Sequence, residues 1–274
     1  MNGNGAVVVT GASTGIGAAT VRELAAAGYT VFGTVRRAKD TALVQAAGAT
    51  PLTMDVTYRP GIVRAQESVA RELGDRPLVG LVNNAGIPGV GPLELIDPEE
   101  LRRTFEVNVF GVVTVTQVFL PMLRASRGRI VNISSVSAYL ALPFAGPYAA
   151  SKFALEAISD SLRRELLPAG VDVVVIQPGS IRTAIWEKIA AMDRSRIKDT
   201  IYEKPLEKLH QLAARSGAKG LPPENVARAV LRALRDHRPP TRILVVAGDP
   251  LGRRLLRLIP DRWIDRMVAK RLRG

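Results

Sequence analysis

Seven short apolar runs, separated by helix-sized segments, constrain the fold of this 274-residue chain more than any other feature. The runs are almost continuously apolar, as expected for strands of a parallel sheet that is covered on both faces. Strands that alternate with helices predict an α/β fold, here a doubly wound, mainly parallel seven-stranded sheet with helices on both faces. The predicted strands lie within residues 6–11, 29–35, 51–56, 78–86, 128–135, 171–179 and 242–248.

Two of the intervening segments show clear helix signals. Residues 15–28 follow a glycine-rich loop, and residues 97–108 begin with Asp97 as a predicted N-cap followed by Pro98. Glu99 and Glu100 then suit the positive end of the helix dipole. The chain has no internal repeat, low-complexity tract or flexible linker, so residues 1–274 are interpreted as one domain.

Composition excludes several kinds of chemistry. There is no cysteine, which removes disulfides, thiolate metal sites and a cysteine nucleophile. The two histidines, His210 and His237, do not have metal-ligand spacing, so no metal site is predicted. The N-terminus lacks the basic leader of a signal peptide. The apolar window 107–123 is too short for a membrane span and is interrupted by polar residues, so we expect a cytoplasmic protein.

A glycine loop follows the first predicted strand. The stretch "TGASTGIG" (residues 10–17) lies between that strand and the first helix. Glycines there allow a tight turn and let phosphate groups approach the N-terminus of the helix, where free N–H groups favour anions. The order strand, loop, helix predicts a Rossmann-type dinucleotide site, although the glycine spacing differs from G-x-G-x-x-G.

The end of the second predicted strand indicates which dinucleotide is preferred. The sequence there is "GTVRRAKD" (residues 33–40), with Val35 where an acid would hold an unmodified ribose. Arg36 and Arg37 follow directly, and guanidinium groups can bind a 2′-phosphate through paired hydrogen bonds. NADP(H) is therefore favoured. NAD(H) stays open, because both arginines can also be solvated loop residues.

The stretch "YAASK" places Tyr148 four residues before Lys152. On a helix these two side chains share one face. An ammonium stabilises a phenolate, so we expect the pKa of Tyr148 to fall toward neutrality, which would give a proton donor at pH 7. Taken alone, the pair also fits an ordinary amphipathic helix.

Several motifs together resemble the short-chain dehydrogenase/reductase family. They are "TGASTGIG" (10–17), "MDVT" (54–57), "NNAG" (83–86), "VN" ending at Asn108, "ISS" ending at Ser135, "YAASK" (148–152) and "QPGSIRT" (177–183). They occur in the order typical of the family over roughly residues 5–250. The pattern looks most like members that act on steroids, retinoids or other apolar alcohols and ketones.

The resemblance implies four catalytic residues. Tyr148 would be the general acid and base, and Lys152 would lower its pKa and bind the nicotinamide ribose. Ser135 rather than its neighbour Ser134 would hold the substrate oxygen, because the family spacing to the tyrosine fits residue 135. Asn108 would support a proton relay through water to Lys152.

The resemblance also implies the cofactor contacts. One departure is Thr14, which stands where many NADP-dependent members have a second basic residue, so the cofactor preference rests on the two arginines. The implied contacts are Gly11, Ser13, Thr14, Gly15, Ile16, Gly17, Arg36, Arg37, Asp55, Val56, Asn83, Ala85, Gly86, Tyr148, Lys152, Pro178, Gly179, Ile181 and Thr183.

Residues 183–221 correspond to a segment that in the family is a variable lid over the substrate. Apolar side chains recur there at near-helical spacing and predict amphipathic helices. We expect some of them to line an apolar substrate pocket, while the others pack on the core. The side chains are Ile185, Trp186, Ile189, Met192, Ile197 and Tyr202.

Residues 251–274 form a basic tail. Residues 183–274 carry 21 Lys and Arg against 10 Asp and Glu, whereas residues 1–182 carry 17 against 15, so the net charge of +13 belongs mainly to the C-terminal third. In the tail Leu255, Leu256, Leu258, Ile259, Trp263, Ile264 and Met267 add apolar surface. A basic amphipathic helix can dock on its own domain or a partner subunit, or lie on an anionic membrane. No nucleic-acid module accompanies the charge, so nucleic acid is not an expected partner.

The sequence therefore predicts an NADP(H)-dependent oxidoreductase that interconverts a carbonyl and its alcohol on an apolar substrate such as a steroid, a retinoid or a lipid-like ketone. The alternative is a sensor or scaffold that binds NADP without chemistry. The segment 107–123 resembles a helix that family members bury between subunits, so we expect a homodimer or homotetramer.

Overall fold

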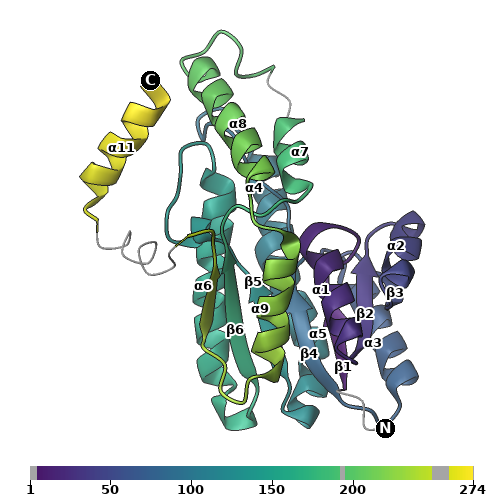
Figure 1. Cartoon of the computed structure of the whole chain (residues 1–274). Coiled ribbons are helices and arrows are strands. Elements are labelled where there is room, and N and C mark those ends of the chain that lie inside the picture. The colour runs from purple at the N-terminus through teal and green to yellow at the C-terminus, as the bar shows by residue number, and fades with distance from the viewer. Residues whose placement is uncertain (1–4, 192–194, 249–258, 274) are drawn as a thin grey trace.

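The computed structural model describes residues 5–191, 195–248 and 259–273 (Figure 1). Seven strands form one sheet, and each overlaps one of the seven predicted runs. Every neighbouring pair is parallel, so the mainly parallel sheet is confirmed. The strands are β1 (Ala6–Val9), β2 (Thr30–Val35), β3 (Thr50–Thr53), β4 (Leu78–Asn83), β5 (Arg129–Ile133), β6 (Asp172–Pro178) and β7 (Arg242–Val245).

The order of the strands creates the place for a site. The order is β3-β2-β1-β4-β5-β6-β7, so the chain builds outward from β1 in one direction and then, from β4, in the other. In open α/β sheets, the connections that leave the carboxyl ends at such a reversal diverge and leave a crevice. The glycine loop leaves β1 at this reversal.

Helices cover both faces of the sheet. Successive residues of a strand point to opposite faces, so Val9 packs with Leu24 and Val230 in one core, while Val8 packs with Phe119 in the other. In Figure 1, α1 and α9 lie side by side in front of the sheet, and α5 lies behind it. The covering helices are α1 (Gly15–Ala26), α2 (Thr41–Ala46) and α9 (Pro223–Arg235) on the first face, and α3 (Arg59–Leu73), α5 (Gly111–Ser126) and α6 (Gly146–Glu165) on the second.

A long helical segment runs from α4 (Pro98–Phe105) into α5. Asp97 caps it as predicted, because its carboxylate accepts a hydrogen bond of 3.0 Å from the Glu99 amide. Between the two helices lies a π-helical stretch, η2 (Glu106–Phe110), which contains Asn108. By length and composition the continuous segment 98–126 could cross a membrane, but 44% of its most apolar window is buried inside the fold, as in a core helix.

The C-terminal third adds helices beyond the sheet. In the predicted lid they are α7 (Ile185–Ala190) and α8 (Glu203–Ala218), which contact each other, and α8 also contacts the tail helix α11 (Asp261–Arg273). Figure 1 shows α7, α8 and α11 at one end of the molecule. Met192 of the lid and Leu255, Leu256 and Leu258 of the tail lie outside the described residues. Short 3-10 turns complete the chain at η1 (Ala38–Asp40), η3 (Val136–Ala138) and η4 (Leu167–Ala169).

Candidate active site

A cleft of about 720 Å³ lies beyond the carboxyl ends of the strands, next to the glycine loop. It brings together residues that are far apart in the sequence. The predicted site residues that line it are Gly11, Ser13, Thr14, Gly15, Ile16, Arg36, Arg37, Asp55, Val56, Ala85, Gly86, Ser135, Tyr148, Lys152, Pro178, Gly179, Ile181 and Thr183. Three others, Gly17, Asn83 and Asn108, lie behind the wall of the cleft.

The glycine loop has the shape that a dinucleotide needs. Gly11 and Gly15 adopt positive φ values of 66° and 56°, which side chains disfavour. A Cβ on Gly17 would lie 2.1 Å from the Gly11 carbonyl oxygen, so glycine is required there for close packing of helix and loop. Thr14 caps α1 without a side-chain hydrogen bond, and the first turn holds no acid. The N–H groups at this end are thus open to an anion, so the residues present fit a pyrophosphate.

Asn84, which was not predicted, holds the loop in place. Its Nδ2 donates to the carbonyl oxygens of Thr10 at 2.9 Å and Gly11 at 3.0 Å, and its own amide donates to Thr10 Oγ1 at 2.9 Å. The side chain of Asn83, which was predicted to contact the cofactor, does not line the cleft. Asn83 is 2% exposed and donates to Asn132 and Thr116 instead. Alternation along the strand places only one of two adjacent asparagines on the loop side.

The two arginines after β2 differ in their surroundings. Arg37 makes a paired contact with Asp40, with Nε–Oδ2 and Nη2–Oδ1 distances of 2.8 Å and 3.1 Å. That hydrogen bond holds the pKa of the Asp40 carboxyl below its usual value and raises the pKa of Arg37. Arg36 also lines the cleft and makes no hydrogen bond or ion pair with the rest of the described chain. Arg36 is therefore the guanidinium that is free to meet a phosphate.

Tyr148 lies at the start of α6 and lines the cleft together with Ser135. The two hydroxyl side chains interact, and this hydrogen-bonding interaction favours a lower pKa of the phenol. Ser134 also lines the cleft, but its hydroxyl has no hydrogen-bond partner among the described residues. Ser135 additionally accepts a hydrogen bond of 3.1 Å from the Ser137 amide, which fixes its side chain.

The expected fall in the pKa of Tyr148 was wrong for the protein alone. Removal of the phenol from water raises its pKa, and the hydrogen bond with Ser135 opposes this rise only in part. Lys152 lies on the same helix face, with Nζ 5.7 Å from the centroid of the Tyr148 ring. Its ammonium donates to the Ile133 carbonyl oxygen at 2.8 Å and not to the phenol. Desolvation of the phenolate is thus the largest influence on the pKa of Tyr148.

Lys152 itself has a strongly perturbed pKa. It is 5% exposed, and burial lowers its pKa from 10.5 to about 8, with the charge of Glu156 opposing the change. A buried lysine whose pKa lies near neutral pH is typical of catalytic sites, although structural ion pairs show such shifts too.

Asn108 does not line the cleft, and its side chain instead holds neighbouring backbone in position. Its side chain is fully buried, accepts from the Ile87 amide at 2.9 Å and donates to the Ile87 carbonyl oxygen at 3.0 Å. It also donates to Ser151 Oγ at 3.0 Å, and Ser151 Oγ donates to the Tyr148 carbonyl oxygen at 2.7 Å. The π-helical turn of η2 therefore connects the loop that follows β4 to the first turn of α6.

Residues of the predicted lid contribute to the lining of the cleft. Of the predicted lid side chains, Ile185, Trp186 and Ile189 line it. Ile197 is buried elsewhere, and the Tyr202 hydroxyl donates to Glu94. Sequence analysis missed the lining residues Val90, Val107, Leu142, Leu209 and His210, because their approach to the cleft depends on how distant segments pack.

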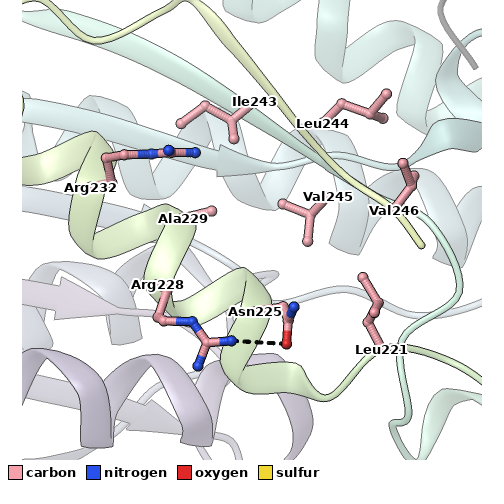
Figure 2. A pocket seen from close by; sticks show the side chains of 9 residues that line it. All are labelled: Leu221, Asn225, Arg228, Ala229, Arg232, Ile243, Leu244, Val245 and Val246. Atoms are coloured by element: carbon pink, nitrogen blue, oxygen red, sulfur yellow. Dashed lines mark hydrogen bonds between the residues drawn. The ribbon is translucent and has the colours of Figure 1, made fainter. Parts of the chain in front are cut away.

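A second hollow, of about 420 Å³, lies between α9 and the edge strand β7 (Figure 2). Its floor is apolar, from Ile243 and Val245, and Arg228 on its rim is hydrogen-bonded to Asn225 at 3.1 Å. This second hollow contains none of the predicted site residues. It also lacks a proton donor next to a lysine of lowered pKa, so the cleft next to the glycine loop is the better candidate site. Among the described residues, no cluster of His, Asp and Glu is placed to hold a metal ion.

Known proteins resemble this chain over most of its length. The family model described as short chain dehydrogenase matches residues 5–194. The NADPH-dependent 3-dehydrocapnine reductase of Ornithobacterium rhinotracheale is 38% identical and covers 97% of this chain and 96% of its own. Human retinol dehydrogenase 16 is 39% identical over 66% of this chain and 58% of its own length. A solved short-chain dehydrogenase from Streptomyces avermitilis is 33% identical, with a TM-score of 0.77 over 98% of this chain and 97% of that chain.

The different surroundings of the two arginines lead to a testable expectation. In Arg36→Ala, we expect NADP⁺ to bind about tenfold or more weakly and NAD⁺ to bind nearly as before, because a charge-assisted contact to the 2′-phosphate is lost. Isothermal titration calorimetry measures both affinities. Arg37→Ala is the matched control, and its effect on NADP⁺ should be smaller because that guanidinium already binds Asp40. An equal or larger loss in Arg37→Ala would contradict this assignment.

Proposed function

This chain belongs to the short-chain dehydrogenase family and is an NAD(P)-dependent oxidoreductase of carbonyl and alcohol groups. From that premise we propose a narrower function. The protein uses NADP(H) to interconvert an apolar ketone or aldehyde with its alcohol. Its substrate class is a steroid, a retinoid or a lipid-like ketone. The observation that carries the proposal is that Ser135, Tyr148 and the buried Lys152 meet in one cleft.

The chain's own residues perform the proton chemistry in this proposal. A bound nicotinamide supplies or accepts the hydride. The Tyr148 hydroxyl donates a proton to the substrate oxygen in reduction and recovers it in oxidation. Ser135 holds that oxygen through a hydrogen bond, and the Lys152 ammonium stabilises negative charge on the phenol as the proton leaves. Asn108 supports the start of α6, and through it a relay of protons by water toward Lys152.

NADP(H) is supported by the free guanidinium of Arg36 at the cleft and by the lack of an acid at Val35. It is also supported by a relative of nearly full-length similarity whose name describes it as NADPH-dependent. Asp40 does not act as the acid that would select NAD(H), because its carboxylate is bound to Arg37.

An apolar substrate is supported by the lining of the cleft. Residues 183–221 contribute the apolar side chains of Ile185, Trp186, Ile189 and Leu209, Leu142 lies in the same lining, and His210 is a buried polar side chain there. Similarity to a retinol dehydrogenase supports the same class. Residues 183–221 therefore act as the substrate lid of a single-domain enzyme.

The alternative, a sensor or scaffold that binds NADP without chemistry, has less support. Such a protein does not need a tyrosine, a serine and a buried lysine at one point of its cleft. The cost of burying the Lys152 ammonium is difficult to explain without a role in catalysis.

Replacement of the phenol hydroxyl tests the proposal directly. In Tyr148→Phe, we expect kcat/KM for carbonyl reduction to fall by roughly 10²–10⁴-fold, which is the range for general acid catalysis. The assay follows absorbance of NADPH with a panel of steroid, retinoid and medium-chain ketones beside small polar ketones. Tyr58→Phe, at an exposed tyrosine, is the control and should keep full activity. Unchanged turnover in Tyr148→Phe, or faster turnover of the polar set, would contradict the mechanism or the substrate class respectively.

Two surface features support further partners. Phe110 and Phe153 are about half exposed (54% and 46%), and large exposed apolar side chains often mark interfaces, so we include homodimer or homotetramer formation in the proposal.

Trp263 and Met267 of α11 are exposed at 64% and 53% beside Arg262, Arg266 and Lys270. This arrangement supports peripheral contact of a cytoplasmic enzyme with an anionic membrane.

One sedimentation experiment tests both partners. We expect the full chain to sediment as a dimer or tetramer, and to move with vesicles that contain phosphatidylserine but not with neutral vesicles. A variant with Trp263→Asp and Met267→Asp should keep the oligomer and lose the vesicles, because the substitutions add charge to the exposed apolar surface. A monomer would refute the first proposal, and equal vesicle binding by the variant would refute the second.

A further inference from the structure

A second buried charge lies directly behind Lys152. Glu156 is one helical turn further along α6 and is 8% exposed. It does not line the cleft and has no place in the proton chemistry described above. A carboxylate is rarely buried without a partner, so its surroundings must account for it.

Both oxygens of Glu156 are bound by neighbouring strands. Oε1 accepts from Gln177 Nε2 of β6 at 2.9 Å, and Oε2 accepts from Arg242 Nε of β7 at 2.8 Å. Arg242 also contacts Asp160 of α6, with an Nη2–Oδ2 distance of 3.0 Å. Glu156 is thus held in a fixed position, and α6 is attached to the sheet at the turn that follows Lys152.

Few other charges face Lys152. On α6 these are Tyr148 and Glu156, and β7 contributes Arg242 through its contact with Glu156. The charged residues of α4 and Glu106 of η2, which also pack near α6, are exposed to solvent. The ionised group of β5, Arg129, is bound to Asp172 at the far end of the strand. Glu156 is therefore the anion that offsets burial of the lysine.

We propose that Glu156 is a positioning residue that keeps Lys152 protonated inside the fold, and that Arg242 and Gln177 hold Glu156 in place for this purpose. The proposal rests on the proposed function, since it is the ammonium form of Lys152 that assists Tyr148. In this arrangement Arg242 of the edge strand β7 holds Glu156, and the negative charge of Glu156 stabilises the ammonium of Lys152. The edge strand is then part of the catalytic apparatus although it touches no substrate.

The test is a titration of Lys152 in the protein without cofactor. Protein is labelled with ¹⁵N-lysine, and the Nζ signal of Lys152 is assigned by its loss in Lys152→Met. In Glu156→Gln the amide keeps the size of the side chain and removes its charge. We expect the titration midpoint of Lys152 to fall by about one pH unit, as a single charge at the separation of one helical turn would produce. An unchanged midpoint overturns the proposal.

Asp160→Asn is the matched control. It removes the other carboxylate that binds Arg242 but lies two turns from Lys152. We expect the Lys152 midpoint to stay where it is in the unaltered protein. A fall as large as that in Glu156→Gln would mean that loosening of β7, and not the nearby charge, is responsible, and would overturn the proposal.

A second variant guards against misfolding of the first. If Glu156→Gln leaves Arg242 buried without a matching charge and the protein fails to fold, the double variant with Arg242→Gln removes both charges. It should shift the Lys152 midpoint in the same direction, because the lost carboxylate is the nearer of the two charges. No shift, or a rise, overturns the proposal.

Enzyme kinetics provide the second readout. The ratio of kcat/KM in Glu156→Gln to that in the unaltered protein should be near one at pH 6. It should fall to about one-tenth above pH 9, because a shift of one pH unit in Lys152 changes its protonated fraction tenfold there. A purely structural loss would lower the ratio equally at every pH, which would count against the proposal. If no carbonyl is turned over at all, the proposed function fails, and the titration of Lys152 is still read independently.

Discussion

The buried ammonium of Lys152 is the constraint around which the candidate site is organised. Its transfer from water is unfavourable, as the fall of its pKa to about 8 shows. Three groups offset that cost: the Ile133 carbonyl oxygen accepts a hydrogen bond at 2.8 Å, the Tyr148 ring lies 5.7 Å from Nζ, and Glu156 supplies an opposite charge. The first comes from the end of strand β5 and the other two from α6, where Arg242 of the edge strand β7 holds Glu156, so the charge is tolerated only when these elements are all in place.

The parallel sheet explains why these groups meet. Ile133 ends β5, and the glycine loop leaves the end of β1, so the carboxyl ends of the strands carry both the lysine's acceptor and the anion site. The helix α6 starts at this edge and brings Tyr148 and Lys152 to it in its first two turns. Asn108, in the π-helical turn of η2, secures the same helix through Ser151. The chemistry of the cleft therefore depends on backbone that the fold has already fixed for packing.

The sequence predicted what is encoded locally. Apolar runs predicted all seven strands, Asp97 predicted its cap, and the glycine loop, Ser135, Tyr148 and Lys152 were placed in one cleft by motifs of fixed spacing. The failures depend on tertiary surroundings. Whether Asn83 or Asn84 faces the loop depends on strand alternation, and whether Arg37 is free depends on Asp40 folding back beside it. The direction in which the pKa of Tyr148 shifts depends on burial, which the spacing of Tyr148 and Lys152 along the helix cannot reveal.

The central claim, that the fold carries a charged lysine at a cost in stability, is tested most directly by urea unfolding of the protein and of Lys152→Met as a function of pH. Because the folded pKa of Lys152 is about 8 and its ordinary value 10.5, the cost is fully present below pH 8. Between these values the unfolded chain binds the extra proton, so the unaltered protein gains stability as pH rises. We expect the Met variant to be the more stable at pH 7, and its advantage to shrink by roughly 3 kcal/mol by about pH 10.5. A difference that stays constant from pH 7 to pH 10, or a Met variant that is less stable at pH 7, would contradict the account.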